Sequence, residues 1–453
     1  MSQYVIIKGG KKLKGTVKPV PNKNSILPAL CACLLTDKEI TYKGVPQSTD
    51  VLKMLEMLKL LGADVNDSDF NKIKISCKRI RSCRVDKDLG CLIRASIMFA
   101  GPLLARFGIA EIPVPGGCVL GKRSIAAHID SFTKAGIKTE FIDGGKNRNN
   151  DDTGYVRFTT PEKIQKKYKI WQFEASVTAT ENLLMYAAGT DSKFEITEAA
   201  SEPHVIELTK MLMNMGAHIN GIGSNKIEVK GKGTKKIRSC TFEPQPDPVD
   251  IGGLMVAAAV TKGKIRIKGA NIPEIVDGII GCFEKFNLKI DRAGKDLVVD
   301  GDIDLFIDPK TTGFPLAADD LPKMAPRPWP GFPVDLLPVL ITLACKTKGK
   351  LLVHNWMYET GLEFVKDLNQ IGANISMLDS QKVIVNGPVA FKGGQITPEA
   401  IIQACKSVFL AALADDVETT ITGVDILKRR YPDIIENYKK LGANIKGPFE
   451  IGQ

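Results

Sequence analysis

Residues 50–63 have the sequence Asp-Val-Leu-Lys-Met-Leu-Glu-Met-Leu-Lys-Leu-Leu-Gly-Ala, an amphipathic helix pattern that ends in glycine. Its apolar residues recur on one helix face, Asp50 is suited to cap its start, and Gly62 tolerates the left-handed conformation that stops a helix. Comparable patterns, each followed by a strand-like segment, recur along the chain at spacings of roughly 70 to 85 residues. The helix stops are Gly62, Gly136, Gly216, Asn287, Gly372 and Gly442.

A second kind of helix, mostly apolar, precedes each amphipathic pattern. Helices with little polar surface are usually buried. We therefore expect each repeat to run from a buried helix through a strand and an amphipathic helix to further strands. The predicted buried helices span residues 26–35, 93–104, 179–188, 252–260, 336–344 and 401–412.

The length of 453 residues exceeds what one ordinary core supports, so two large domains are expected. A composition break at residues 244–248, where proline alternates with polar residues, divides the repeats into two sets and predicts a hinge. Buried helices packed together, with sheets outside them, would give each domain an inside-out α/β layering.

The composition excludes several classes of protein. A 44% hydrophobic and 25% charged chain is typical of a soluble globular protein. The 10 cysteines show no CxxC pair and no His/Cys cluster, which argues against structural zinc and a secreted disulfide framework. Met1 leads directly into a strand-like segment, without a signal peptide, and the longest apolar runs are far shorter than a membrane span. We therefore expect a cytoplasmic protein without membrane insertion.

The net charge of +11 suits an anionic ligand, although a basic chain also fits nucleic acid or a membrane surface. The lysines are dispersed, aromatic residues make up only 6% of the chain, and no nucleic-acid motif is present. These features argue against nucleic acid as a partner.

Residues 114–123, Val-Pro-Gly-Gly-Cys-Val-Leu-Gly-Lys-Arg, predict a loop that approaches a ligand closely. Lys122 and Arg123 favour the thiolate of Cys118 and attract anions. The alternative is a surface loop with a chance cysteine. Several buried helices also begin with polar or charged residues, among them Lys23. If helix N-termini of the two domains face each other, their dipoles converge on one anion site.

These segments together resemble the enolpyruvyl transferases over essentially the whole chain. The matching motifs are Lys23-Asn24 with Leu27-Pro28, Arg94-Ala95-Ser96-Ile97, Pro115-Gly116-Gly117-Cys118 with Gly121 and Arg123, Phe332-Pro333 with Asp335, and Arg429 before Tyr431. The Gly-Gly-Cys loop is the most specific motif. The resemblance implies transfer of enolpyruvyl from phosphoenolpyruvate to the 3-hydroxyl of UDP-N-acetylglucosamine with release of phosphate, for peptidoglycan synthesis, without cofactor or metal.

For the fold, the resemblance implies a two-domain inside-out α/β barrel, each domain built from three repeated βαβαββ units. The first strand then joins the C-terminal half. The expected domains are residues 1–22 plus 246–453, with Asp335 and Arg429, and residues 23–245, with the Cys118 loop.

The catalytic roles that the resemblance implies fall on Cys118, Asp335 and Lys23. Cys118 protonates C3 of phosphoenolpyruvate and is the residue alkylated by fosfomycin, Asp335 takes the proton of the sugar hydroxyl, and Lys23 grips phosphate. Taken alone, Lys23 could be a surface lysine and Asp335 a helix cap. The implied substrate-binding residues are Asn24, Arg94, Arg123, Ser124, Ile125, His128, Ser176, Val177, Thr178 and Arg429.

The chain departs from the family at several positions. Gly361 and Gln403 stand where the family has arginines that hold the substrate carboxylate, Glu174 replaces a lysine, and Met98 replaces a tryptophan. Arg430, Lys406 and Trp356 are candidates to compensate. Two alternative functions follow: enolpyruvyl transfer to a different hydroxyl acceptor, and a catalytically silent homologue that binds a nucleotide sugar.

Overall fold

The computed structural model describes residues 3–114, 124–142, 154–310, 313–318 and 320–450. These residues form two compact units, each with its own hydrophobic core. The unit called the amino unit below holds the described residues from Pro21 to Gln245. The carboxyl unit holds those up to Val20 and from Pro246 onward. No helix formed by the described residues has the length and apolar character needed to cross a membrane.

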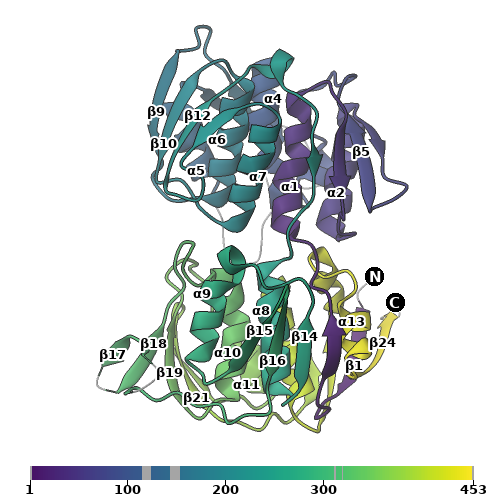
Figure 1. Ribbon diagram of the computed structural model, residues 1–453, viewed down its shortest axis with the longest axis vertical. Coiled ribbons are helices and arrows are strands. Elements are labelled where there is room, and N and C mark those ends of the chain that lie inside the picture. Colours follow the sequence, from purple (N-terminus) through teal and green to yellow (C-terminus); the bar gives the residue numbers. More distant parts are fainter. Residues whose placement is uncertain (1–2, 115–123, 143–153, 311–312, 319, 451–453) are drawn as a thin grey trace. The chain divides into compact units, whose positions relative to one another are not determined.

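Helices with little exposed surface run through the amino unit. All of α1 (Lys23–Ala32) except Asn24 is buried, and α6 (Val177–Gly189) is buried from Ala179 to its end. The α6 helix packs against α1, α4 and α7 (Figure 1). The other helices are α2 (Thr49–Leu61), α3 (Lys87–Gly90), α4 (Ala100–Phe107), α5 (Ala126–Lys134) and α7 (Pro203–Asn214), with short 3-10 helices η1 (Cys33–Leu35), η2 (Arg94–Phe99) and η3 (Thr234–Lys236).

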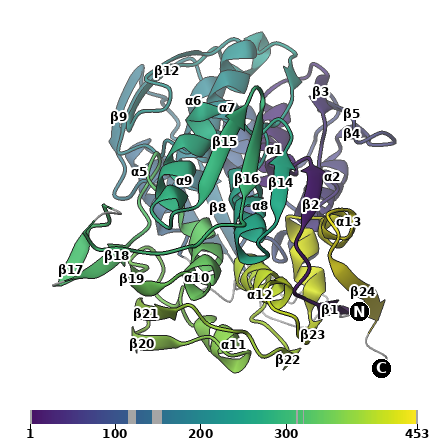
Figure 2. The same cartoon turned by 60° about the horizontal axis from the view of Figure 1, so that its bottom comes forward.

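In the carboxyl unit, α8, α10 and α12 pack against one another. Every residue of α8 and α10 is buried. Figure 2 shows α10 and α12 beside each other, with β19 and β21 next to α10. The helices are α8 (Pro248–Val260), α9 (Pro273–Glu284), α10 (Leu337–Cys345), α11 (Val365–Gln370), α12 (Ile402–Ala414) and α13 (Ile434–Lys440), with η4 (Val334–Leu336) and η5 (Val424–Arg429).

The described residues of the amino unit form three sheets, ordered β13-β3-β5-β4, β11-β12-β10-β9 and β6-β8-β7. The first two are mixed, because β13 runs parallel to β3 and β9 parallel to β10. The strands are β3 (Ile40–Lys43), β4 (Asp64–Asn66), β5 (Lys72–Ser76), β6 (Ile109–Pro113), β7 (Lys138–Ile142), β8 (Tyr155–Thr159), β9 (Lys167–Trp171), β10 (Lys193–Thr197), β11 (His218–Asn220), β12 (Lys226–Lys230) and β13 (Thr241–Phe242).

The described residues of the carboxyl unit also form three mixed sheets, ordered β22-β23-β1-β24, β15-β16-β14-β2 and β17-β18-β19-β21-β20. The chain's first strand, β1, lies between two of its last ones, with Ile7 opposite Thr419 and Ile445 (Figure 1). The strands are β1 (Gln3–Lys8), β2 (Lys14–Val17), β14 (Lys264–Ile267), β15 (Lys289–Ala293), β16 (Asp296–Asp300), β17 (Leu316–Ala318), β18 (Leu321–Met324), β19 (Gly349–His354), β20 (Ile375–Asp379), β21 (Lys382–Gly387), β22 (Gly394–Ile396), β23 (Glu418–Thr422) and β24 (Asn444–Glu450).

The helix stops predicted from the sequence adopt the expected conformation. Gly62, Gly136, Gly216, Asn287, Gly372 and Gly442 all have positive φ. Some boundaries differ from the prediction. The segments predicted as single helices over residues 26–35 and 93–104 each divide, the first into α1 and η1 and the second into η2 and α4, because residues 33–35 and 94–99 form tighter 3-10 turns. Ser48, not Asp50, occupies the N-cap position of α2, without a side-chain cap hydrogen bond.

Close packing in α8 generates a stability prediction. A Cβ on Gly253 would lie 2.7 Å from Cε and 2.8 Å from Nζ of Lys406, whereas a Cβ on Gly281 in α9 would meet nothing within 4 Å. We expect Gly253→Ala to lower the free energy of unfolding by about 1–3 kcal/mol, because Lys406 is buried and cannot move aside freely. Gly281→Ala should raise it by about 0.5–1 kcal/mol. Urea unfolding followed by circular dichroism measures both, and equal effects would contradict the packing argument.

Candidate active site

Lys23 begins α1, and its side chain is buried beside Asp50. Nζ donates to Oδ2 of Asp50 at 2.9 Å, and the two side chains are 9% and 4% exposed. A cation at a helix N-terminus meets the positive end of the helix dipole, and the carboxylate offsets that repulsion. The alternative of a surface lysine is therefore wrong. Asp50, predicted as a cap of α2, instead binds this lysine.

The start of α1 is fixed by further polar contacts. The side-chain oxygen of Asn22 accepts a hydrogen bond from the backbone N–H of Asn24 at 3.0 Å and so caps the helix. Glu207 of α7 accepts from the hydroxyl of Ser25 at 2.6 Å and from the backbone N–H of Gln245 at 2.9 Å. Lys23 and Asn24 therefore project from a rigid helix end.

A second group of predicted residues meets where α5 begins. Arg94 starts η2, and its Nη2 donates to the backbone oxygen of Ser124 at 3.1 Å. Ile125 occupies the position before α5, and Ser124 accepts the backbone N–H of Ala126 at 2.9 Å through its hydroxyl. The structure thus brings Arg94, Ser124 and Ile125 together.

His128, one turn further along α5, links that helix to α6. Its Nε2 lies 3.0 Å from Oγ1 of Thr178, and its Nδ1 lies 3.0 Å from Nδ2 of Asn182. The amide of Asn182 is oriented by two backbone partners, because Oδ1 accepts from Gly101 N–H and Nδ2 donates to the oxygen of Ile97. Nδ1 of His128 must then be an acceptor, so the neutral ring carries its proton on Nε2 and donates it to Thr178.

Burial, with a smaller contribution from Arg94, lowers the pKa of His128 to about 3. The ring therefore stays neutral at ordinary pH and keeps the tautomer that holds Thr178 in place. The His128 side chain is buried, and its Nε2 contacts Thr178 in the first turn of α6.

The start of α6 is formed by Ser176, Val177 and Thr178, and Thr178 connects it to His128 of α5. Ser176 occupies the cap position without forming a side-chain cap, so the first-turn N–H groups are not capped by it. Such a helix start suits an anionic group. All three side chains are only partly buried.

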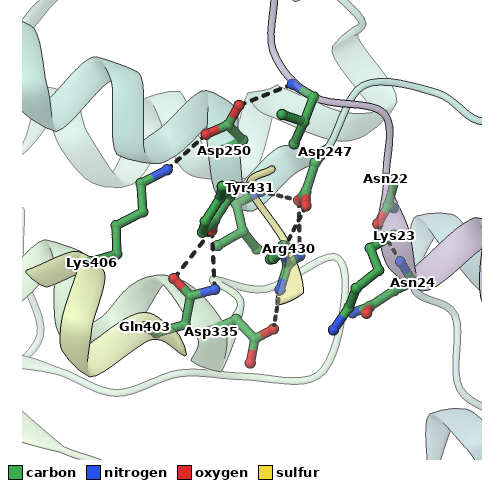
Figure 3. Close-up of polar contacts among 12 residues, drawn as sticks. Asn22, Lys23, Asn24, Asp247, Asp250, Asp335, Gln403, Lys406, Arg430 and Tyr431 are labelled. Carbon is green, nitrogen blue, oxygen red and sulfur yellow. Dashed lines mark hydrogen bonds and ion pairs between the residues drawn. The ribbon is translucent and has the colours of Figure 1, made fainter. Parts of the chain in front are cut away.

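In the carboxyl unit, Arg430 bridges two carboxylates (Figure 3). Its Nε and Nη2 donate to the two oxygens of Asp247 at 2.6 and 2.8 Å, and its Nη1 donates to Oδ2 of Asp335 at 2.9 Å. Burial by itself lowers the pKa of Arg430, but the Asp247 carboxylate outweighs it and holds the pKa well above the usual value. The guanidinium is therefore always charged.

Asp335 lies in η4 with its side chain 34% exposed, whereas Asp247 is fully buried. The alternative of a helix cap for Asp335 is wrong, because Pro333 precedes η4 at the cap position and Leu336 stands before α10. Asp247 is the capping residue here, accepting the Val249 N–H at the start of α8 at 2.9 Å.

Two of the three candidates for replacing the missing arginines, Lys406 and Arg430, are already paired. Lys406 is fully buried, donates to Oδ1 of Asp250 at 2.7 Å and lies 3.7 Å from the ring centre of Tyr431. Arg430 is committed to Asp247 and Asp335. Gln403 exchanges hydrogen bonds with the hydroxyl of Tyr431 at 3.1 and 3.3 Å.

The other candidate, Trp356, is half-exposed, and its indole N–H donates to the oxygen of Pro326 at 2.9 Å. Gly361 is closely packed, since a Cβ there would lie 2.2 Å from Nδ2 of Asn355. Arg429 ends η5 and is partly buried. Cys118 and Arg123 lie outside the described residues.

Sequence reasoning missed the partners that fix these side chains. Asp247 precedes Pro248 at the start of an apolar helix, a capping pattern that the composition break at residues 244–248 obscured. Asn182 is a polar residue inside an apolar helix, which signals a specific partner. Asp250 is likewise a polar residue in an apolar helix, but the sequence does not identify its partner Lys406, which is 156 residues away.

No group of three or more His, Cys, Asp and Glu side chains suited to a metal ion occurs in the part of the chain that the structure describes.

Protonation of His128 generates a pH prediction. Because the folded-state pKa lies near 3 and the unfolded value near 6.5, the unfolded chain binds an extra proton between those limits. Stability should fall as pH drops from about 6.5 toward 3, by up to about 1.4 kcal/mol per pH unit from this residue. His128→Gln should flatten that part of the profile, measured by urea unfolding at several pH values. A variant profile as steep as the parent's would contradict the assignment.

Comparison with known proteins shows which family the chain resembles. A family model described as EPSP synthase (3-phosphoshikimate 1-carboxyvinyltransferase) matches residues 7–438. A UDP-N-acetylglucosamine 1-carboxyvinyltransferase from Bradyrhizobium diazoefficiens is 35% identical over 444 residues, covering 98% of this chain and 97% of the relative. One from Treponema denticola is 33% identical over 447 residues, covering 98% and 99%.

Solved structures agree in fold. The enolpyruvyl transferase NikO from Streptomyces tendae superposes with a TM-score of 0.83 at 19% identity, covering 98% of each chain. EPSP synthase from Acinetobacter baumannii gives 0.70 at 16% identity, covering 99% of this chain and 100% of the other. The observed mixed α/β architecture is therefore that of these enzymes. From the family match and the full-length relatives together, the chain belongs to the enolpyruvyl (1-carboxyvinyl) transferase family.

Proposed function

We propose that the protein transfers the enolpyruvyl group of phosphoenolpyruvate to the 3-hydroxyl of UDP-N-acetylglucosamine and releases phosphate, a step of peptidoglycan precursor synthesis. The observation that carries this proposal is the name shared by relatives that are at least 33% identical across 98% of the chain. The buried Lys23–Asp50 pair and the Arg430-bound Asp335 support it, because both matched residues are held in fixed positions.

In the proposed reaction, Asp335 removes the proton of the sugar hydroxyl, and the resulting oxygen bonds to C2 of phosphoenolpyruvate. Cys118 delivers a proton to C3, which gives a tetrahedral ketal. Loss of a proton from C3 and cleavage of the C2–O bond to phosphate then restore the double bond. Lys23, Arg123 and Arg429 hold the phosphate, since a lysine ammonium and planar guanidinium groups are suited to this anion.

The nucleotide sugar is assigned to the amino unit. Asn24 and Arg94 project from helix ends, and the first turn of α6 at Ser176, Val177 and Thr178 offers backbone N–H groups to the diphosphate. Ser124 and Ile125 lie in the segment assigned to uracil. His128 contributes by holding Thr178 through the hydrogen bond from its Nε2.

The finer architecture belongs to the same proposal. We take the amino and carboxyl units as the two domains of the family's inside-out α/β barrel, with three repeats in each. A cytoplasmic location fits substrates that are charged phosphate esters, which do not cross membranes unaided.

The reaction can be tested directly. Phosphate release from phosphoenolpyruvate should require UDP-N-acetylglucosamine, and Asp335→Asn should lower kcat by about 10²–10⁴-fold, because a positioned general base contributes on that scale. Arg266→Gln, which breaks an exposed ion pair with Asp296 in the same unit, is the matched control and should act like the parent. Release with another hydroxyl acceptor would point to a different substrate, and binding of the UDP-sugar without turnover would indicate a silent homologue.

The two missing arginines generate a second prediction. Each charge-assisted contact contributes about 1.5–3 kcal/mol, so phosphoenolpyruvate should bind weakly and KM should be high. The substitutions Gly361→Arg and Gln403→Arg together should lower KM for phosphoenolpyruvate by roughly two to four orders of magnitude. This range assumes that the two contact energies add and that about 1.4 kcal/mol corresponds to a factor of ten. Because Asn355 blocks position 361, Asn355→Ala is included in the variant, and Asn355→Ala alone is its control.

Steady-state kinetics at varied phosphoenolpyruvate measure this effect. A parent enzyme that already saturates at low phosphoenolpyruvate would show that other cations hold the carboxylate.

A further inference from the structure

We propose that Arg430 is a positioning residue for Asp335, and that Asp247 controls how strongly Arg430 neutralises it. The inference rests on the proposed function, since Asp335 is the base only in that reaction. Arg430 does not belong to the motifs that carry the family resemblance, and its role comes from three contacts in the carboxyl unit.

The geometry makes Arg430 a fixed support and not a mobile surface side chain. The residue is 3% exposed, and two of its nitrogens form a fork on Asp247, which is buried and caps α8. With Nε and Nη2 committed, the orientation of the guanidinium plane is set. Nη1 then places a single donor at Oδ2 of Asp335, 2.9 Å away (Figure 3).

The charge distribution explains why this support leaves Asp335 able to accept a proton. Arg430 is shared between two carboxylates, and the closer, two-bond contact goes to Asp247. Arg430 gives Asp335 one hydrogen bond and only part of its positive charge. A cation devoted to Asp335 alone would hold it ionised more strongly and weaken it as a base.

The helices α8 and α10 pack against η4, and their one charged side chain is paired. The α8 helix contributes Asp250, which is bound by Lys406, and α10 carries no charged residue between Leu337 and Cys345. The phenol of Tyr431, next to Arg430, has a pKa well above its usual value because it is buried, so it stays neutral. Arg430 therefore bonds Asp335 directly, and Asp247 acts on Asp335 through its two bonds to Arg430.

Two variants should shift the pH profile in opposite directions. Without the cation, Asp335 takes up a proton more easily, so Arg430→Gln should move the acid limb of kcat/KM to higher pH by about one unit. Asp247→Asn leaves Arg430 to Asp335 alone and should move the acid limb to lower pH. Loss of orientation should also lower kcat in Arg430→Gln by about 10–100-fold. If Arg430 had only a structural role, the two variants would not shift the acid limb of kcat/KM in opposite directions.

A double variant protects the test against misfolding. Arg430→Gln alone leaves Asp247 buried without its partner, whereas Arg430→Gln/Asp247→Asn leaves a neutral pair, and asparagine can still cap α8. The double variant should fold, lose activity like Arg430→Gln and show the upward shift. Arg430→Lys should restore much of the acid limb but less of kcat, because an ammonium lacks the fork. Arg266→Gln serves again as the control.

A second readout separates this inference from the proposed function. In protein labelled with carbon-13 at the aspartate carboxyl group, the signal of Asp335 is identified by its loss in Asp335→Asn, and its titration midpoint is followed by NMR. Opposite displacements in Arg430→Gln/Asp247→Asn and Asp247→Asn are expected. If the parent releases no phosphate yet the midpoints move, the proposed function fails while control of Asp335 by Arg430 stands. Unmoved midpoints with an unchanged pH profile would overturn the inference.

Discussion

Helices almost without polar surface occupy the centre of each unit, and their burial constrains where charge can lie. In α8 and α10 every residue is buried, so a charged group along most of either helix would lose its hydration without a partner. The one charged residue of these two helices, Asp250, lies in the first turn of α8 and is paired with Lys406. The residues to which the proposed function gives a role also lie near helix ends, at the starts of α1, η2 and α6 and in the short helix η4.

In both units, a buried cation is paired with a buried carboxylate. Lys23 is bound by Asp50, and Arg430 by Asp247, with each pair next to the start of an apolar helix. A buried pair adds little net stability, but removing one partner costs about 3–5 kcal/mol because it leaves an uncompensated charge. These pairs therefore fix geometry more than they stabilise the fold. That suits residues whose side chains must meet a substrate at a defined place.

The charge around Asp335 differs from what the sequence suggested. Arg430 and Lys406 are buried cations that at first resembled replacements for the two missing arginines. Counted as ionised, these two positive groups face the three carboxylates of Asp247, Asp250 and Asp335, which leaves one net negative charge. The pairing satisfies the carboxylates and provides no surplus cation for an anionic substrate. In the proposed reaction, Gly361 and Gln403 are therefore expected to weaken binding of the substrate carboxylate.

The sequence by itself determined the order of helices and strands, the left-handed stops such as Gly62 and Asn287, and the apolar helices, because periodicity and local conformational preference are properties of short segments. It also singled out Lys23 and Asp335 through their motifs. Only the tertiary structure decided which partner each charge has: Asp50 for Lys23, Asp247 for Arg430, and Asp250 for Lys406 across 156 residues of chain. Pairing of this kind depends on how distant helices pack, and the desolvation that makes it necessary exists only once the core has formed.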